Sequence, residues 1–214
     1  MDNLDAQKFS ETYKKELDFL KEKGGLTGEW SNVYDHCFTE GRVAAVFGGL
    51  LRLSAQDTDA LVKAALLHDW YKRKEREATK AKGAGEYDQA ARKSAALLQE
   101  AGYSEDIVLL TQSVGHTSLK TILESDNFLH KLMHYIDDIT FNNQVTGVDE
   151  RLKAWGKYQE LNELGRALFG GKTYSQVQQE VGHKIEQEVA SHMGCAPEEV
   201  IPTVKARLQE APTV

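Results

Sequence analysis

A strongly apolar stretch, LVKAALLHDWYK at residues 61–72, contains a histidine followed directly by an aspartate, His68 and Asp69. At the helical period, His68 falls on the same face as Leu61 and Ala64, so its imidazole points into the protein. Asp69 lies about 100° further round the helix, close enough to reach the same point from the side. Two such polar side chains are costly unless they bind a partner, and a metal ion would satisfy both. The rest of the chain must then supply the remaining ligands.

The chain has the pattern of an all-α protein. All three prolines lie after residue 196, and apolar residues recur at intervals of three and four. We expect one domain over residues 1–214, with a core metal-binding bundle at about 28–145 and a C-terminal helical extension at about 146–214. The expected helices are residues 4–23, 32–53, a segment capped by Asp57 or Thr58 that ends at the His-Asp pair, 89–101, 104–114, 127–141, 149–169, 175–193 and 198–210.

Composition narrows the class of partner. The net charge is −7 and the pI is near 5.5, so the surface repels phosphate backbones and we expect no nucleic-acid polymer as ligand. No apolar run reaches the length of a membrane span, and the start MDNLDAQKF lacks the basic and apolar regions of a secretory signal. Two cysteines are too few for a disulfide framework. We therefore expect a cytoplasmic protein with no membrane partner and at most a local basic pocket for a small phosphate ester.

Two other predicted helices offer further ligands. His36 has apolar neighbours that let it point inward, and beside the His-Asp pair we expect it to bind the same ion. In the piece LHKLMHYIDD, a step of about 100° per residue places Asp137 at the border of the apolar stripe, whereas Asp138 points nearly opposite. We therefore expect Asp137, and not Asp138, to be a ligand. His130, His134 and Asp138 form a row at intervals of four, which we expect to be a water-exposed face.

The order of these residues resembles the HD-domain superfamily of metal-dependent phosphohydrolases, which is named for its adjacent His and Asp. The match covers about residues 30–145, with His36, then LLHDWYK, then Asp137 on a later helix. LLHDWYK is similar to the family's Leu-Leu-His-Asp-Ile-Gly-Lys consensus, with Lys72 at the basic position. The resemblance implies an HD-domain-like helical bundle with the metal among its central helices. It also implies hydrolysis of phosphate esters, often of nucleotides.

A second segment, SVGHTSL at residues 113–119, is similar to a His-Thr segment in a di-metal branch of that superfamily. This branch includes the symmetrical diadenosine tetraphosphate hydrolases, and the resemblance implies that His116 binds a second ion. Another His opens a helix in that branch, where this chain has Glu86 or Asp88, and a carboxylate can replace it. We expect one divalent transition-metal ion, Mn, Fe, Co, Ni or Zn, with a second ion at His116 and Glu86 as the alternative.

Such a centre predicts hydrolysis by a metal-activated water. An ion held by two imidazoles and two carboxylates keeps open positions for water and a phosphate oxygen, and it lowers the pKa of that water. Asp69 and Lys72 are expected to act in catalysis. The cations nearest in sequence for binding the phosphoryl oxygens are Lys72, Arg73 and Arg92, and Lys72 is the first choice among them. The charged piece at residues 72–88 is either an active-site lid or a solvated connector.

Three functional hypotheses are compatible with these residues. We favour a phosphohydrolase acting on a nucleotide or another small phosphate ester. A minority of the same fold cleaves C–C or C–P bonds with a di-iron centre, so an iron-dependent oxygenase is the second hypothesis. The third is a non-catalytic nucleotide-sensing or interaction module, against which the intact ligand set counts, because unused buried polar groups are costly. A homodimer through the C-terminal helices stays open, and the sequence identifies no particular substrate.

Overall fold

The computed structural model describes residues 6–82, 86–114, 118–154, 162 and 165–209. Over these residues the chain is an all-α helical bundle with one short β-hairpin, which confirms the predicted fold class. The helices are α1 (Ala6–Thr12), α2 (Lys14–Glu22), α3 (Ser31–Leu50), α4 (Ala55–Leu67), α5 (Lys72–Lys82), α6 (Glu86–Glu100), α7 (Glu105–Gln112), α8 (Phe128–Asp138), α9 (Val148–Ala154), α11 (Tyr174–Met193) and α12 (Pro197–Gln209), and the strands are β1 (Thr140–Phe141) and β2 (Gln144–Val145).

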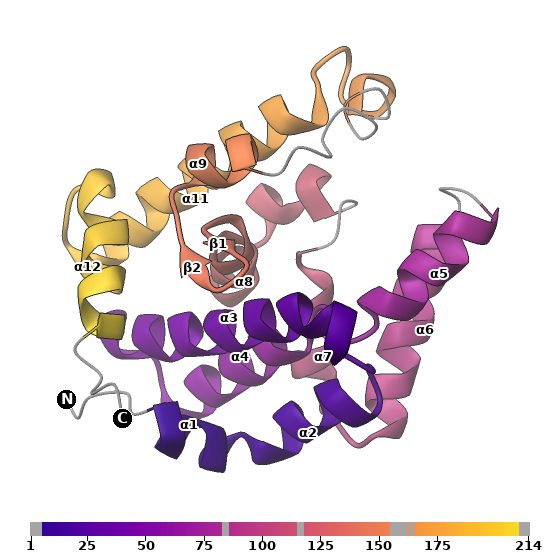
Figure 1. Cartoon of the computed structure of the whole chain (residues 1–214). Helices are drawn as coiled ribbons and strands as arrows, with labels where there is room; N and C mark the ends of the chain where they lie inside the picture. The colour runs from indigo at the N-terminus through magenta and orange to yellow at the C-terminus, as the bar shows by residue number, and fades with distance from the viewer. Residues whose placement is uncertain (1–5, 83–85, 115–117, 155–161, 163–164, 210–214) are drawn as a thin grey trace.

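Helices α3 and α4 pack side by side at the centre of the molecule (Figure 1). Their close approach depends on Gly41, since a Cβ there would lie 2.8 Å from the Leu66 side chain. Ser54 caps α4 by accepting a hydrogen bond from the Asp57 backbone N–H at 3.0 Å, so the predicted cap at Asp57 or Thr58 is wrong by one turn. The tight pairing brings the first half of α3 next to the end of α4, where the His-Asp pair lies.

Helix α8 lies between this central pair and the C-terminal helix α11 (Figure 1). Its side chains Leu132, Met133, Tyr135 and Ile136 are fully buried, because both sides of the helix are covered. The helix ends at Asp138, earlier than the predicted residue 141, and the chain then turns through the β1–β2 hairpin. This end of α8 therefore faces the start of α9 as well as the centre of the bundle.

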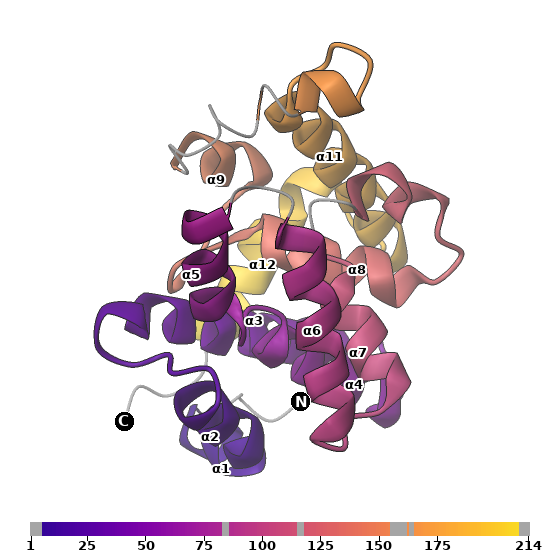
Figure 2. The same ribbon diagram turned by 90° about the vertical axis from the view of Figure 1, so that its right-hand side faces the viewer.

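Most of the charged segment after the His-Asp pair is helical, and residues 83–85 within it lie outside the described residues. Helix α5 begins at Lys72 and packs against α6, and the two project together at the right of Figure 1 and face the viewer in Figure 2. In the C-terminal part of the chain, the predicted helix 149–169 begins as α9, which ends at Ala154. Residues 155–161 lie outside the described residues. Helices α11 and α12 agree with the predicted 175–193 and 198–210 to within one residue at each end.

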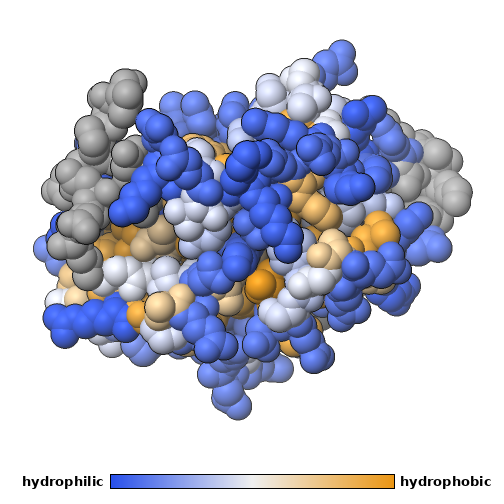
Figure 3. All heavy atoms as spheres, turned by 90° about the horizontal axis from the view of Figure 1, so that it is seen from below, coloured by the Kyte–Doolittle hydropathy of each residue, from blue (hydrophilic) through white to orange (hydrophobic). Residues whose placement is uncertain are grey.

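The face seen from below is largely hydrophilic (Figure 3). Seen from below in Figure 3, apolar residues form small separate patches between charged and polar ones. Within the described residues, the large apolar side chains that are exposed are Leu109 at 43% and Leu168 at 46%, and single exposed apolar residues are common on protein surfaces. Across the same part of the chain, no helix combines the length and apolar character needed to cross a membrane.

Candidate metal centre

Four side chains from three helices converge at the end of α4. His36 and Glu40 lie one turn apart on α3, His68 follows the last residue of α4, and Asp137 lies near the end of α8. Each offers one ligand atom, and these atoms lie within 4.8 Å of one another. Ligands at about 2.0–2.2 Å from a shared ion fall within such a separation. Three of the four predicted ligands of the first ion, His36, His68 and Asp137, are therefore brought together, and Glu40 joins them.

His68 is held with one ring nitrogen available to a ligand. Its side chain is 2% exposed, and its Nδ1 lies 2.9 Å from the Ala65 carbonyl oxygen. A proton on Nδ1 donates to that carbonyl, which leaves the Nε2 lone pair unprotonated. Nε2 is buried and has no hydrogen-bond partner within the described residues. This arrangement fixes the tautomer in the way that metal-binding imidazoles require.

Glu40 is the residue that the sequence reasoning missed. Its side chain is fully buried, with Oε1 2.9 Å from His36 Nε2 and Oε2 3.2 Å from His68 Nδ1. A signal for it is present in the sequence, because Glu40 follows His36 by four residues and lies on the same face of α3 as the apolar Val43 and Phe47. A charged residue inside an apolar stripe indicates a buried polar site in the same way that His68 does.

The charges in this group shift one another's titration. Burial opposes the charged form of His36, but the Glu40 and Asp137 carboxylates outweigh it and raise the pKa of His36 to about 10. Burial raises the pKa of Glu40, against the opposing effect of His36 and His68. Burial also acts on Asp137, yet Arg151 and the two histidines hold the pKa of its carboxyl well below the usual range. Without another cation, His36 is therefore protonated at neutral pH and pairs with the Asp137 and Glu40 carboxylates, so a metal ion has to displace that proton.

Asp69, the second half of the His-Asp pair, lies beside this group but is not one of its four residues. Its Oδ2 is 3.8 Å from His68 Nε2, and its Oδ1 is 3.2 Å from the Lys72 ammonium. Although burial works against ionisation, Lys72, His68 and His36 lower the pKa of Asp69 to about 2. In turn the Asp69 and Glu75 carboxylates raise the pKa of Lys72 despite burial, so this lysine keeps its charge.

Asp137 is also bound by a residue from the C-terminal extension. Arg151 on α9 donates from Nη2 to Asp137 Oδ1 at 2.6 Å and from Nε to the Thr140 carbonyl at 2.8 Å. Asp137 Oδ1 lies 3.4 Å from His36 Nε2, so the same oxygen faces both the arginine and the candidate site. No sequence pattern near residue 151 indicated this contact, because it depends on the path of the chain after α8.

The predicted exposed row on α8 is wrong for two of its three members. His134 and Asp138 are 1% and 2% exposed, because α11 covers this side of the helix. Gln178 on α11 donates to Asp138 Oδ1, and its Nε2 lies 3.1 Å from His134 Nε2. The helical wheel separated Asp137 from Asp138 correctly, but it could not show that a second helix buries the opposite face. Asp138 belongs to an internal network rather than to the candidate centre.

The remaining predicted site residues lie apart from the four-residue group or outside the described part. Arg73 donates from Nε to Glu77 at 3.1 Å and is half exposed, and Arg92 is exposed on α6. Glu86 is the first residue of α6, and its side chain lies outside the described part, as does the whole of His116. The predicted second metal therefore stays a prediction.

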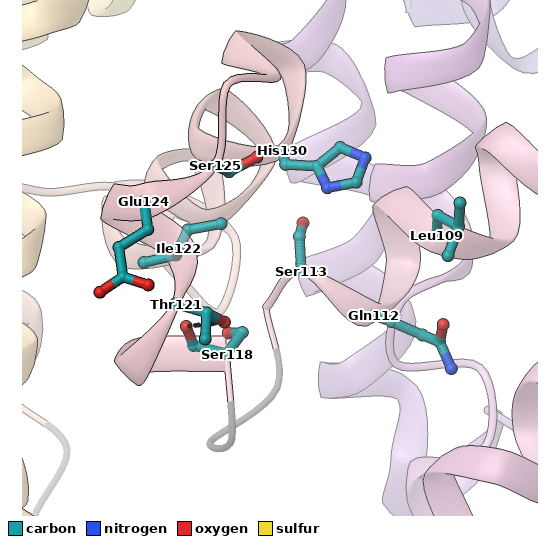
Figure 4. Close-up of a pocket in the computed structure, with 9 residues that line it drawn as sticks. All are labelled: Leu109, Gln112, Ser113, Ser118, Thr121, Ile122, Glu124, Ser125 and His130. Atoms are coloured by element: carbon teal, nitrogen blue, oxygen red, sulfur yellow. Dashed lines mark hydrogen bonds between the residues drawn. The ribbon is translucent and has the colours of Figure 1, made fainter.

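A separate hollow of about 460 Å³ opens between α7 and the start of α8 (Figure 4). Polar side chains such as Ser113, Thr121, Glu124 and His130 line it, together with the apolar Leu109. None of the described residues that line it is a predicted ligand, and none is a lysine or an arginine. This hollow therefore shares no residue with the four-residue group at the end of α4.

Comparison of the chain with protein-family models, with curated proteins and with solved structures finds no match. The chemistry of the four-residue group and of the side chains around it is therefore what indicates a function.

Proposed function

We propose that this chain is a metal-dependent phosphohydrolase of the HD-domain type, acting on a nucleotide or another small phosphate ester. The observation that supports the proposal most is the convergence of His36, His68 and Asp137, whose ligand atoms come from three helices and a span of about one hundred residues. These residues were expected to meet from their pattern in the sequence alone. Buried imidazoles and carboxylates that converge in this way are typical of a divalent metal site.

The residues present fit a divalent ion. His68 Nε2 and both Glu40 oxygens are buried, and within the described residues no aligned hydrogen bond satisfies them. Burying such atoms without a partner costs several kcal/mol, on the order of 2–7 for a neutral group and more for a charge. A cation held by His36, His68, Asp137 and a further carboxylate would offset that cost. Mixed nitrogen and oxygen donors favour Mn, Fe, Co, Ni or Zn.

A bound ion of this kind would supply Lewis-acid activation of water and of a phosphoryl oxygen. The protein contributes a fixed positive charge next to it, because Asp69 holds the Lys72 ammonium at 3.2 Å and the raised pKa of Lys72 keeps it protonated. An ammonium in a partly buried site stabilises negative charge that builds up on phosphoryl oxygens. Lys72 is therefore the residue proposed to bind the substrate phosphate, in preference to Arg73, because Lys72 is the more buried of the two and its partner Asp69 lies 3.8 Å from His68.

The test is hydrolysis by protein that has been stripped of metal and then loaded with Mn, Co, Ni or Zn separately. We expect phosphate release from generic phosphate esters, and faster release from one member of a panel of nucleotides and dinucleoside polyphosphates. His68→Ala and Asp137→Asn should each lower the rate at least about 100-fold, because each removes a ligand.

Asp35→Asn is the matched control, since Asp35 is an exposed carboxylate next to His36 on the same helix. It should hydrolyse at the wild-type rate. Activity that persists in both ligand variants would refute the hydrolase proposal. Oxygen consumption by the iron-loaded protein, in place of phosphate release, would identify an oxygenase instead.

A further inference from the structure

We infer that His183 and Asp149 form a pH-sensitive latch between α11 and α9, and that this latch positions Arg151 at the candidate metal centre. His183 is a positioning residue, since it acts on Asp137 only through α9 and Arg151. The effect on the metal rests on the proposed function, whereas the latch belongs to the fold and can be measured in metal-free protein.

Both ring nitrogens of His183 face a carboxylate. Nε2 lies 3.0 Å from Asp149 Oδ1 on α9, and Nδ1 lies 3.3 Å from Oε2 of Glu186, three residues further along α11. Only the imidazolium form carries a proton on both nitrogens, so only the charged ring can donate both hydrogen bonds. A neutral ring always turns one lone pair toward a carboxylate, and one of the two contacts is then lost.

The partners of His183 are themselves held in place by neutral donors. Tyr135 on α8 donates to Glu186 Oε1 at 2.7 Å, so the other oxygen of that carboxylate is presented to the imidazole. Gln179 on α11 donates to Asp149 Oδ1 at 2.7 Å. Because these two contacts do not depend on the charge of the ring, the pH-dependent part of the link between α9 and α11 comes from His183.

The surroundings of the ring set the pH range in which the latch holds. Within the described residues, the charged groups that act on the ring are the Asp149 and Glu186 carboxylates, and Lys153 of α9 acts on Asp149. Partial burial favours the neutral ring, but the two carboxylates raise the pKa of His183 above its usual value. The contact therefore stabilises the fold in full below about pH 6.5, and this stability is lost as the pH rises through the raised pKa.

The latch and Arg151 lie on opposite sides of α9, which packs on α11 (Figure 1). Two residues in a helix correspond to about 200° of rotation, so Asp149 faces α11 while Arg151 reaches Asp137 at 2.6 Å. Beside the latch the two helices touch closely, because a Cβ on Gly182 would lie 2.8 Å from the Val148 side chain. Any displacement of α9 from α11 therefore moves the arginine relative to the Asp137 carboxylate.

The latch is tested first in metal-free protein, by amide hydrogen exchange of α9 corrected for the intrinsic rates. From about pH 6 to about pH 8.5 the protection of α9 in wild type should fall about two- to fivefold, as expected for loss of a partly exposed ion pair. In His183→Gln, which keeps a neutral donor, protection should not change with pH. His192→Gln removes an exposed histidine from the same helix and should behave as wild type. A fall of the same size in His183→Gln would overturn the latch.

The effect on the centre is measured as the ratio of the Co²⁺ affinities of wild type and His183→Gln at one pH, so that the other titrating groups cancel. Wild type should bind about two- to fivefold more tightly at about pH 6, and the two proteins should bind alike at about pH 8.5. Equal affinities at both pH values would overturn the coupling to Arg151. Wild-type protein that binds no Co²⁺ contradicts the proposed function, and the latch is then decided by hydrogen exchange alone.

Discussion

Asp137 and Asp138 are neighbours on α8, yet their side chains belong to different polar groups. Asp137 faces His36 and is bound by Arg151 at 2.6 Å, whereas Asp138 accepts a hydrogen bond from Gln178 on the opposite side of the helix. Burial raises the pKa of Asp138 to about 6, with His134 and Arg151 acting against that rise. The two carboxylates therefore have the same local sequence and different chemical surroundings.

This difference predicts opposite consequences for two single substitutions. Asp137→Asn should lower Co²⁺ affinity at least about tenfold and hydrolysis at least about 100-fold, because the metal loses a charged ligand. Asp138→Ala should leave Co²⁺ affinity nearly unchanged but lower the free energy of unfolding by about 2 kcal/mol, since Gln178 then loses a buried partner. Calorimetric metal titration and urea unfolding of both variants measure the two effects. Equal loss of metal binding in both variants would contradict the separation.

At the scale of the element, the short helix α9 contributes more to the candidate centre than its length suggests. It follows the β1–β2 hairpin, and Arg151 reaches back from it to Asp137 and to the Thr140 carbonyl. Its first residue, Val148, packs against Gly182 of α11, where a Cβ would lie 2.8 Å from the valine side chain. Helix α9 is thus held between the centre and the C-terminal helix, so the extension takes part in forming the site.

Arg151→Met tests this contribution. The arginine fixes the orientation of the Asp137 carboxylate through a charge-assisted hydrogen bond, and loss of such a partner lowers metal affinity about tenfold in typical metal sites. Lys153→Met removes an exposed cation from the same helix and should leave affinity unchanged. The measurement is a Co²⁺ titration of both variants. Tighter binding by Arg151→Met would instead mean that the arginine competes with the ion for Asp137.

At the scale of the whole molecule, the candidate centre joins helices that are distant in the chain. It links α3, the end of α4 and α8, while the network of His134, Asp138 and Gln178 links α8 to α11. Tyr135 adds a further connection by donating to Glu186 on α11 at 2.7 Å. Polar contacts on both sides of α8 thus connect the central pair of helices to the C-terminal extension.

Metal binding should therefore stabilise the entire fold. A ligand at about 100 times its Kd adds about 2.7 kcal/mol to the free energy of unfolding, which for a chain of this size raises Tm by roughly 5–10 °C. Thermal unfolding of metal-free protein with and without Mn²⁺, Co²⁺ or Zn²⁺ measures the shift, and a chelator should reverse it. In His68→Ala the shift should be lost. A shift of the same size in that variant would show that the stabilising ion binds elsewhere.

The sequence by itself determined the all-α class, most of the helix boundaries and the convergence of His36, His68 and Asp137. Helical periodicity is a local property, so it indicates which face of each helix is buried and which polar residues on that face need a partner. The boundary errors at Ser54 and at the end of α8 arose where a cap or a hairpin competed with a continuing pattern.

Only the tertiary structure decided that Glu40 completes the four-residue group, that Asp138 and His134 are buried, and that Arg151 binds Asp137. Each of these depends on which element covers a given face, and the periodicity of one helix carries no information about its neighbour. The burial of a charged side chain is set by contacts across the chain, because a single helix in water can hydrate every carboxylate it presents.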